Sequence, residues 1–386
     1  MKLIVHRGTH QIGGCAVEIK TANAGIIIDF GSELEPETAT SLHIAGVTHG
    51  ESNCDGVFFT HYHGDHIGLL NSINKNIPLY IGALSKKILL LQNERQKVYD
   101  TNRLQAMIPF VAGDPITVRD IKITPFMVDH SAFDAYMFLI EAEGKRILHT
   151  GDFRTHGFRG KGLSKVLDKY IGEVDFLICE GTVLNRSAQK SMTEHELSQQ
   201  AAGLLKENKY VFVICASTNI DRIAAFSSAV PRGKYCICDD YQKKLLALVS
   251  HATAEATSAY QFPKILKYGK NLNEKMERLG FCFFVRLGNP MHKAIMEQYK
   301  DKNPLVIYSM WKGYLGDERT NDFIKDYRLE TLHTSGHADY AALSMLIKKT
   351  NPKRIIPIHT EVPERLRELC GQCSILSVKD KEVIIL

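Results

Sequence analysis

Short apolar runs recur through the first part of the chain, separated by glycine, asparagine or charged residues. Many are rich in Val and Ile, which is typical of β-strands. The runs occupy residues 2–7, 15–21, 24–31, 56–61, 78–82, 121–128, 135–142 and 145–152. Residues 65–74 and 85–100 instead repeat apolar positions at the three- and four-residue spacing of a packed helix. This part of the chain is therefore predicted to be rich in β-structure, with a few helices.

The pattern changes near residue 186, where helical and strand-like segments begin to alternate. Thr193 and Glu196 have the spacing of a capping box at a helix start. Apolar runs then alternate with amphipathic stretches, which indicates a parallel sheet flanked by helices. The expected strands are 210–217, 235–240, 281–287 and 303–309, and the expected helices include 221–230 and 242–257.

After residue 328 the chain returns to short units, with a helix expected at 339–351 and strands at 354–360 and 382–386. The fold class is therefore predicted to be α/β, with one metal-binding domain interrupted by a second α/β domain. We expect residues 1–185 and 329–386 to form the first domain and residues 186–328 to form the insertion. Both termini then belong to the first domain.

Composition narrows the class of protein. Hydrophobic residues make up 44% of the chain and charged residues 24%, as in an ordinary globular protein. There is no run of 18 apolar residues and no apolar leader, and the nine cysteines do not form a regular framework of disulfides. These features predict a cytoplasmic protein without a membrane partner.

Charge is informative mainly through its distribution. The net charge of +5 is small for 386 residues and does not by itself indicate a nucleic-acid partner. Residues 264–302 alone carry nine Lys and Arg against four Asp and Glu. This stretch fits either a solvated helical face or a surface that binds a polyanion.

The most informative stretch is FFTHYHGDHIGLL, residues 58–70. His61 and His63 follow an apolar strand and, at i and i+2, fall on the same side of an extended chain, so they can reach one ion. Gly64 lets the backbone turn, so that Asp65 and His66 can face a second ion. The alternatives are a polar turn or a closed structural zinc site, but structural zinc favours cysteine-rich sets and Cys54 lies outside this cluster.

HYHGDH is similar to the signature of the metallo-β-lactamase superfamily. Asp29 in IIIDFG, His130 in VDHSAF and Asp152 in HTGDFR match its remaining motifs in order. The resemblance extends to the beta-CASP branch, which processes nucleic acids, and within it to ribonuclease J. Its motifs A, B and C are matched by Glu180 in CEGTVLNR, His337 in HTSGHADY and His359 in IPIHTE.

The resemblance implies an αββα sandwich carrying an inserted beta-CASP domain. The seven candidate ligands, which are Asp152 and the six residues named below, are too many for one tetrahedral ion. They suit two divalent ions, zinc or manganese. Asp152 would bridge the two ions, because its carboxylate offers two oxygens. The expected ligands are His61, His63 and His130 for the first ion, and Asp65, His66 and His359 for the second.

Several further residues are expected to act beside the ions. We expect Asp29 to orient a ligand histidine, Glu180 to support the catalytic centre, and Asp65 to be needed for catalysis as well as for metal binding. His337 would donate to a phosphate oxygen or protonate the leaving oxygen, and Ser335 and Gly336 before it would let the backbone approach the substrate. The stretch CASTNIDRI resembles a phosphate-handling segment of the family and implies that Asn219 and Arg222 bind a 5′-phosphate.

These features predict a ribonuclease that hydrolyses RNA phosphodiester bonds through a hydroxide activated by two metal ions. Whether it cuts internally or from the 5′ end stays open, as does the RNA that it cuts. A histidine at the position of His359 implies RNA rather than DNA within the family. The expected partner is single-stranded RNA, and Trp311 and Tyr314 fit either base stacking or core packing.

Two other classes of protein fit parts of this pattern. The metal site alone would also suit a hydrolase of a small ester or thioester, but such an enzyme has no evident use for His337, His359 and the insertion. A non-catalytic RNA-binding relative would be expected to have lost metal ligands, and all seven are present. The chain ends without the separate C-terminal domain through which ribonuclease J assembles, so a homodimer is expected only on the resemblance.

Overall fold

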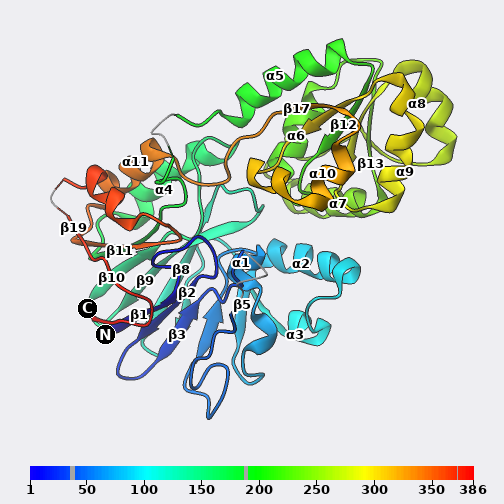
Figure 1. Cartoon of the computed structure of the whole chain (residues 1–386). Helices are drawn as coiled ribbons and strands as arrows, with labels where there is room; N and C mark the ends of the chain where they lie inside the picture. The colour runs from blue at the N-terminus through cyan, green and yellow to red at the C-terminus, as the bar shows by residue number, and fades with distance from the viewer. Residues whose placement is uncertain (35–39, 187–189, 372) are drawn as a thin grey trace. The chain divides into compact units, whose positions relative to one another are not determined.

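The structure, a computed structural model, describes residues 1–34, 40–186, 190–371 and 373–386 (Figure 1). Its contacts divide the chain into two compact units. The first unit comprises Met1–Thr155, Arg159–Lys190 and Gly336–Leu386, and the inserted unit comprises His156–Phe158 and Ser191–Ser335. Both termini belong to the first unit.

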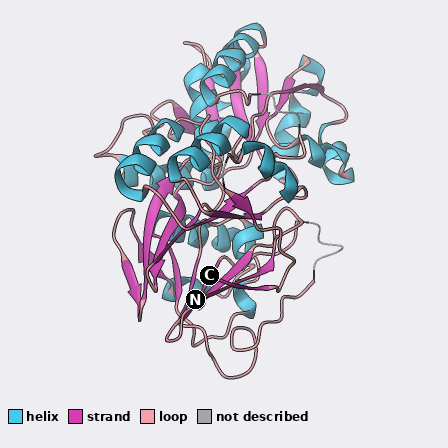
Figure 2. Ribbon diagram, turned by 90° about the vertical axis from the view of Figure 1, so that its left-hand side faces the viewer, coloured by secondary structure: helices cyan, strands magenta, loops and turns pink. Residues whose placement is uncertain are grey.

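The first unit contains two seven-stranded sheets. In one sheet β1 at the N-terminus pairs with β20 at the C-terminus, and both views in Figures 1 and 2 show the two termini side by side. The strand order of this sheet is β20 (Val383–Ile385), β1 (Lys2–Arg7), β2 (Ala16–Lys20), β3 (Gly25–Ile28), β4 (Gly56–Phe58), β5 (Leu79–Gly82) and β6 (Ile108–Phe110). The order of the other sheet is β19 (Ser374–Ile375), β18 (Arg354–Ile358), β11 (Phe176–Glu180), β10 (Lys145–His149), β9 (Ala135–Ala142), β8 (Ile121–Val128) and β7 (Ile116–Val118).

The two sheets face each other across one apolar core. Alternate residues of both sheets fill it, such as Ile26 and Phe58 from the first sheet and Phe138 and Ile178 from the second. A second apolar cluster packs helix α11 (Tyr340–Thr350) on the outer face of the second sheet. The remaining helical segments of this unit are α1 (Gly64–Ile67), η1 (Leu70–Ser72), α2 (Ala83–Gln96), α3 (Thr101–Ala106), η2 (Gly160–Gly162), α4 (Leu163–Val166), η3 (Leu167–Ile171) and η7 (Pro363–Leu369).

The inserted unit is built on a six-stranded sheet, and every pair of neighbouring strands in it is parallel. Its strand order is β14 (Ile265–Lys267), β13 (Tyr235–Cys238), β15 (Phe281–Val285), β12 (Tyr210–Ile214), β16 (Leu305–Tyr308) and β17 (Arg328–Thr331). Its helical segments are α5 (Glu194–Glu207), α6 (Ile220–Ala229), α7 (Asp240–Thr253), η4 (Lys270–Leu272), α8 (Asn273–Leu279), α9 (Pro290–Gln298), η5 (Lys300–Lys302), η6 (Lys312–Gly316) and α10 (Glu318–Ile324). The capping box of Thr193 and Glu196 begins α5 as the sequence predicts.

The predicted fold class is confirmed: a two-sheet α/β unit is interrupted by a second, parallel α/β unit. The boundaries differ from those expected from the sequence, because contacts place them near residues 190 and 335 rather than 185 and 328. The reason at the second boundary is β17, which extends the inserted sheet beside β16. Across the described ranges, every helix is too short or too polar to cross a bilayer.

Candidate metal centre

The polar residues of the centre lie at the carboxyl ends of strands in the first unit. Asp29 follows β3, and the HYHGDH stretch follows β4. In the facing sheet His130 follows β8, Asp152 follows β10, Glu180 ends β11 and His359 follows β18. Because β3 and β4 are parallel, and β10, β11 and β18 are parallel, these strand ends gather at one edge of the two sheets.

Two of these residues have backbone angles that L-residues seldom adopt. Asp29 has a φ of 59° and His359 has a φ of 51°. Such left-handed conformations cost free energy and are typically kept where a side chain must be aimed. Both side chains turn into the centre, where Asp29 contacts His66 and His359 lies beside Asp65.

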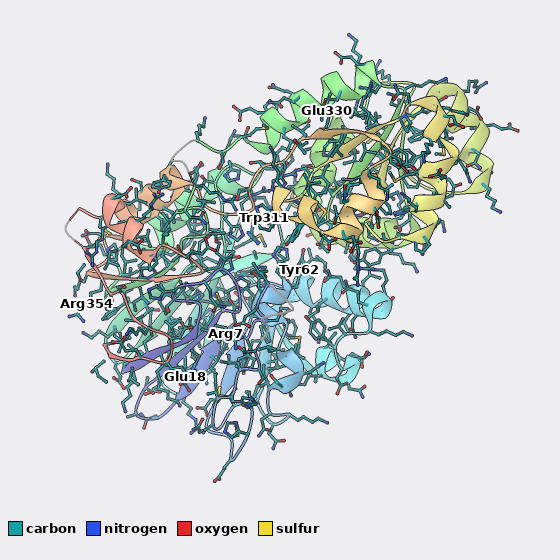
Figure 3. The ribbon with its side chains drawn as sticks, in the orientation of Figure 1. Arg7, Glu18, Tyr62, Trp311, Glu330 and Arg354 are labelled. Atoms are coloured by element: carbon teal, nitrogen blue, oxygen red, sulfur yellow. The ribbon has the colours of Figure 1, made fainter. Side chains whose placement is uncertain are left out.

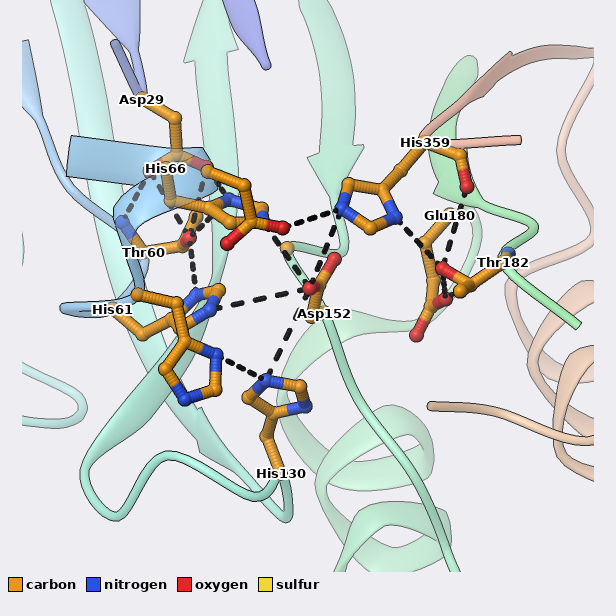
Figure 4. Close-up of polar contacts among 12 residues, drawn as sticks. Asp29, Thr60, His61, His66, His130, Asp152, Glu180, Thr182 and His359 are labelled. Atoms are coloured by element: carbon orange, nitrogen blue, oxygen red, sulfur yellow. Dashed lines mark hydrogen bonds and ion pairs between the residues drawn. The ribbon is translucent and has the colours of Figure 1, made fainter. Parts of the chain in front are cut away.

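Among the described residues, possible ligand atoms form four groups, and two of these groups meet at one oxygen. The atoms of each group lie within 4.8 Å of one another; one group is His61, His63 and His130, and the other is Asp65, His66, Asp152 and His359. Asp152 Oδ2 is close to an Nε2 atom from both groups, and Figure 4 marks these contacts. The distances are 3.1 Å to His66, 3.8 Å to His359, and 3.9 Å to both His61 and His130.

These separations fit metal coordination better than hydrogen bonding. Donors about 2.1 Å from a tetrahedral ion lie about 3.4 Å from one another. The observed range of 3.1–3.9 Å brackets that value and extends beyond ordinary hydrogen-bond lengths. Among the described residues, the buried His61 Nε2 has no hydrogen-bond partner. The cluster is therefore suited to hold divalent cations.

Asp29 and Thr60 fix the orientation of two ligand histidines. His66 Nδ1–H donates to Asp29 Oδ2 at 2.8 Å. Thr60 Oγ1–H donates to the same carboxylate at 2.8 Å, so Thr60 Oγ1 accepts from His61 Nδ1–H at 3.0 Å. Each Nδ1 then carries the proton, and each Nε2 turns a lone pair toward the cluster.

Glu180 and Thr182 repeat this arrangement on the facing sheet. Thr182 Oγ1–H donates to Glu180 Oε2 at 2.8 Å, so Thr182 Oγ1 accepts from His359 Nδ1–H at 2.7 Å. His337 Nδ1–H donates directly to Glu180 Oε2 at 3.2 Å. In both halves of the centre, one carboxylate orients one histidine directly and another through a threonine hydroxyl.

The backbone of Gly336 orients His130. His130 Nδ1–H donates to Gly336 O at 2.7 Å, which leaves Nε2 for the cluster. A Cβ on Gly336 would come within 2.6 Å of Ser131 Oγ, so only glycine permits this close approach.

The loops that carry His130 and Asp152 are tied by a buried ion pair, in which Arg154 Nε donates to Asp129 Oδ1 at 2.8 Å.

Burial sets the protonation of the first group. Burial and the neighbouring imidazoles hold the pKa of His61 and His130 well below the usual range, and burial lowers the pKa of His63 to about 4. All three rings are therefore neutral at pH 7, which is the form that binds metal. His63 Nδ1 and His130 Nε2 face each other at 3.2 Å, where one cation can accept both lone pairs.

The second group is electrostatically different because it contains carboxylates. Burial opposes ionisation of Asp65, but the charge of His66 together with the hydrogen bond and charge of His359 outweighs burial and lowers the pKa of Asp65. Burial likewise opposes the charged form of His66, yet Asp152 and Asp29 raise its pKa. A divalent cation and the second proton of His66 compete for the same Nε2 lone pair.

One nearby thiol does not suit the second group. Cys15 lies within ligand distance of His66 and His359, but burial raises the pKa of its thiol well above the usual range. A neutral thiol is a poor ligand, because metals bind the thiolate.

The centre opens to solvent on one side. Asp29, His61, His66, His130, Asp152, Glu180 and His359 are buried, with at most 2% of each residue exposed. His63, Asp65 and His337 are only half-buried, and 22% of the His337 side chain is exposed. A substrate that reaches the cluster therefore meets these three side chains.

Other residues expected at the site lie in the inserted unit and have structural contacts. Arg222 is fully buried, and its guanidinium donates to Glu194, Ser309 and Thr334, so it presents no free donor to a phosphate. Asn219 caps α6 by accepting from Arg222 N. Ser335 contributes its carbonyl oxygen, which accepts from His156 Nε2–H at 2.7 Å.

The basic stretch 264–302 is also largely used within the inserted unit. Lys267 pairs with Asp240, Arg286 with Asp239, and Lys302 with Glu277. These pairs favour the solvated-face interpretation over a continuous surface for a polyanion.

Thr60 and Thr182 are the site residues that sequence reasoning missed. A threonine has no distinctive chemistry, and the only available signal was position, since Thr60 directly precedes His61 and Thr182 lies two residues after Glu180. Their hydroxyls become informative only when both hydrogen-bond partners are known.

Removing the Thr182 hydroxyl is expected to loosen one ligand of the second group. Thr182→Val leaves His359 Nδ1–H and Glu180 Oε2 without their shared partner, and such outer contacts typically contribute about 10- to 100-fold in metal affinity. Competition with a chelator measures this loss. Thr350→Val is the matched control, because Thr350 is also fully buried but donates within α11, to Leu346 O; equal affinities for the two variants would contradict the assignment.

Comparisons with known proteins support the fold class. Residues 26–213 match the beta-lactamase superfamily domain, and residues 326–372 match the Zn-dependent metallo-hydrolase RNA specificity domain. A solved protein of unknown function from Enterococcus faecalis V583 shares the fold, with a TM-score of 0.78 at 21% identity over 100% of this chain and 99% of that one.

Curated relatives are similar at low identity. Ribonuclease J of Helicobacter pylori (strain ATCC 700392 / 26695) is 24% identical over 92% of this chain and 55% of its own length. Ribonuclease J of Mycoplasma genitalium is 22% identical over 97% of this chain and 71% of its own length. The probable RNase MJ4 of Methanocaldococcus jannaschii is 26% identical over 48% of this chain and 46% of its own length. The chain thus spans about half the length of the first of these relatives.

Proposed function

We propose that this chain, which belongs to the metallo-β-lactamase superfamily and is ribonuclease J-like, is a metal-dependent ribonuclease that hydrolyses phosphodiester bonds of single-stranded RNA. One observation carries the proposal: two groups of ligand atoms meet at Asp152 Oδ2, beneath a surface formed by His63, Asp65 and His337. The names of the relatives and the RNA specificity domain support RNA as the substrate.

We assign His61, His63 and His130 to one divalent ion and Asp65, His66 and His359 to a second, with Asp152 shared. Zinc suits this set, because imidazole and carboxylate are its usual non-thiolate ligands, and manganese is the alternative. When bound, two such ions supply a hydroxide nucleophile near neutral pH and offset the negative charge of the phosphodiester.

The protein's own residues orient the metal ligands and donate a proton to the substrate. Asp29 and Glu180 hold the ligand histidines in one tautomer, directly and through Thr60 and Thr182. His337 is the half-exposed imidazole nearest to both Glu180 and Asp152, at 3.2 Å and 3.6 Å. Burial alone would lower the pKa of His337, but Glu180 and Asp152 raise it to about 9. At neutral pH His337 is therefore placed to donate a proton to the leaving oxygen.

The test is cleavage of three labelled RNAs of one sequence, with a 5′-monophosphate, with a 5′-triphosphate and as a closed circle. We expect cleavage of single-stranded RNA that a chelator stops and that added zinc or manganese restores. Cleavage of the circle would assign internal cutting, because a circle has no end. Hydrolysis of a small ester such as p-nitrophenyl acetate with no action on any RNA would overturn the proposal in favour of a small-molecule hydrolase.

Metal content provides an independent measurement. Elemental analysis after dialysis is expected to find two divalent ions per chain, and sedimentation of the same sample tests the homodimer that the family resemblance implies. A single ion at saturating metal would contradict the shared role of Asp152.

A further inference from the structure

Two large aromatic side chains lie at the surface of the inserted unit, just after β16. Trp311 is 49% exposed and Tyr314 is 45% exposed. Their rings meet edge to face, with centroids 5.2 Å apart and planes at 89°. Figure 3 shows Trp311 at the surface of its unit. Exposed rings that adjoin one another form an apolar patch, and a partner that covers them would gain free energy.

The backbone holds the two rings in place. Trp311 O accepts from Tyr308 O–H at 3.1 Å and from Tyr314 N–H at 3.2 Å. The indole lies against Gly313, where a Cβ would come within 2.2 Å of the ring carbons. The position of the indole thus depends on a glycine that leaves space for it.

The flanking apolar residues serve the core, whereas the two rings do not. Met310 and Leu315 pack against the apolar core of the inserted unit. Trp311 and Tyr314 between them face solvent, which decides against core packing as their role. The location is also typical of a binding surface, because the segment follows the carboxyl end of β16 in a parallel sheet.

A lysine, Lys312, lies between the two aromatic residues in sequence. Lys312 is exposed, and within the described part of the chain it has no ion-pair partner. Lys312 differs in this respect from Lys267 and Lys302, whose ammonium groups are paired with carboxylates. The next acidic side chain, Asp317, is engaged as the cap of α10, where it accepts from Thr320 N–H.

We propose that Trp311 and Tyr314, with Lys312, form an aromatic platform on which unpaired bases of an RNA strand stack while the lysine contacts the phosphodiester backbone. The proposal rests on the proposed ribonuclease function. Stacking on aromatic rings suits single strands of any sequence, because every base has a π-face. A duplex buries those faces within its own stack, so the platform favours unpaired RNA over paired RNA.

Tryptophan fluorescence tests the platform directly, because Trp311 is the only tryptophan of the chain. Titration of the metal-loaded protein with an oligouridylate is expected to quench the indole emission to a saturable limit. The same RNA annealed to its complement is expected to quench it far less. Equal quenching by both RNAs, or none by either, would overturn the proposal.

Substitution tests what the platform contributes. Trp311→Ala is expected to raise KM for a long single-stranded RNA about 10-fold with kcat unchanged, and Trp311→Phe to keep most of the affinity. Tyr170→Ala is the matched control, because Tyr170 is 55% exposed beside Lys169 but lies in the first unit. An unchanged KM in Trp311→Ala would overturn the platform, because the ring would then make no contact with the RNA. A large loss of thermal stability would also overturn it, because the ring would then be part of the core.

The two proposals can fail separately. Quenching by single-stranded RNA without cleavage of any RNA would leave the platform standing and remove the ribonuclease function. Metal-dependent cleavage without quenching would remove the platform alone. Turnover of an activated phosphodiester such as bis(p-nitrophenyl) phosphate, which carries no nucleobase and no RNA strand, is expected to be equal in the wild type and in Trp311→Ala.

Discussion

Asp152→Ala is expected to abolish RNA cleavage and to release metal from both ligand groups. Asp152 Oδ2 lies close to histidines of both groups, at 3.1 Å from His66 Nε2 and 3.9 Å from His130 Nε2. Lowering the pKa of water from about 15.7 to about 7 corresponds to roughly 12 kcal/mol, so losing even part of that effect takes the rate below detection. Single-turnover cleavage of a labelled RNA and elemental analysis of the purified variant measure the two losses.

The matched control is Asp168→Ala. Asp168 belongs to the same unit, but its carboxylate accepts from Lys349 Nζ at the surface, 2.5 Å away at the closest approach. That variant is expected to keep its metal and its activity. Circular dichroism shows whether Asp152→Ala still folds, and a folded variant with wild-type cleavage would contradict the shared ligand.

The candidate site residues were identified because their motifs resemble those of the family, and several of them also terminate apolar strands. Asp29, His61, Glu180 and His359 each follow or end such a run, and parallel strands bring their carboxyl ends to one edge. The sequence pattern does not reveal which outer residue hydrogen-bonds to which ligand histidine. Thr60 and Thr182 were missed, because a hydroxyl is assigned as a relay only when its donor and its acceptor are both in view.

Arg222 shows the opposite difficulty, since its expected role as a 5′-phosphate ligand came from the resemblance of CASTNIDRI to a phosphate-handling segment of the family. Its guanidinium is instead fully buried and paired with Glu194, which lies far away in sequence. The insertion boundary has a similar cause. β17 is exposed along its length and has little apolar signal, so its place in the inserted sheet follows from its pairing with β16.

His337→Ala is expected to slow RNA cleavage by about 10²- to 10⁴-fold while both ions stay bound, because it removes a proton donor and no metal ligand of either group. Glu180 and Asp152 overcome the effect of burial and raise the pKa of His337 to about 9. The active form is the protonated one, so the His337-dependent rate falls as the pH rises through this pKa. Cations in the adjoining cluster lower the pKa, which places the falling limb below pH 9.

The pH profile separates a proton donor from a merely structural side chain. In the wild type kcat is expected to fall as the pH becomes alkaline. In His337→Ala kcat is low throughout and is expected not to fall further in that pH range. His10→Ala is the matched control, because His10 is exposed and, among the described residues, its side chain hydrogen-bonds with neighbouring Thr9. A substrate with a good leaving group, such as a p-nitrophenyl ester of a nucleotide, needs little protonation and is expected to be hydrolysed nearly as fast by His337→Ala. An equal loss on both substrates would mean that His337 binds the phosphate rather than protonates the leaving oxygen, because a binding contact is needed by both.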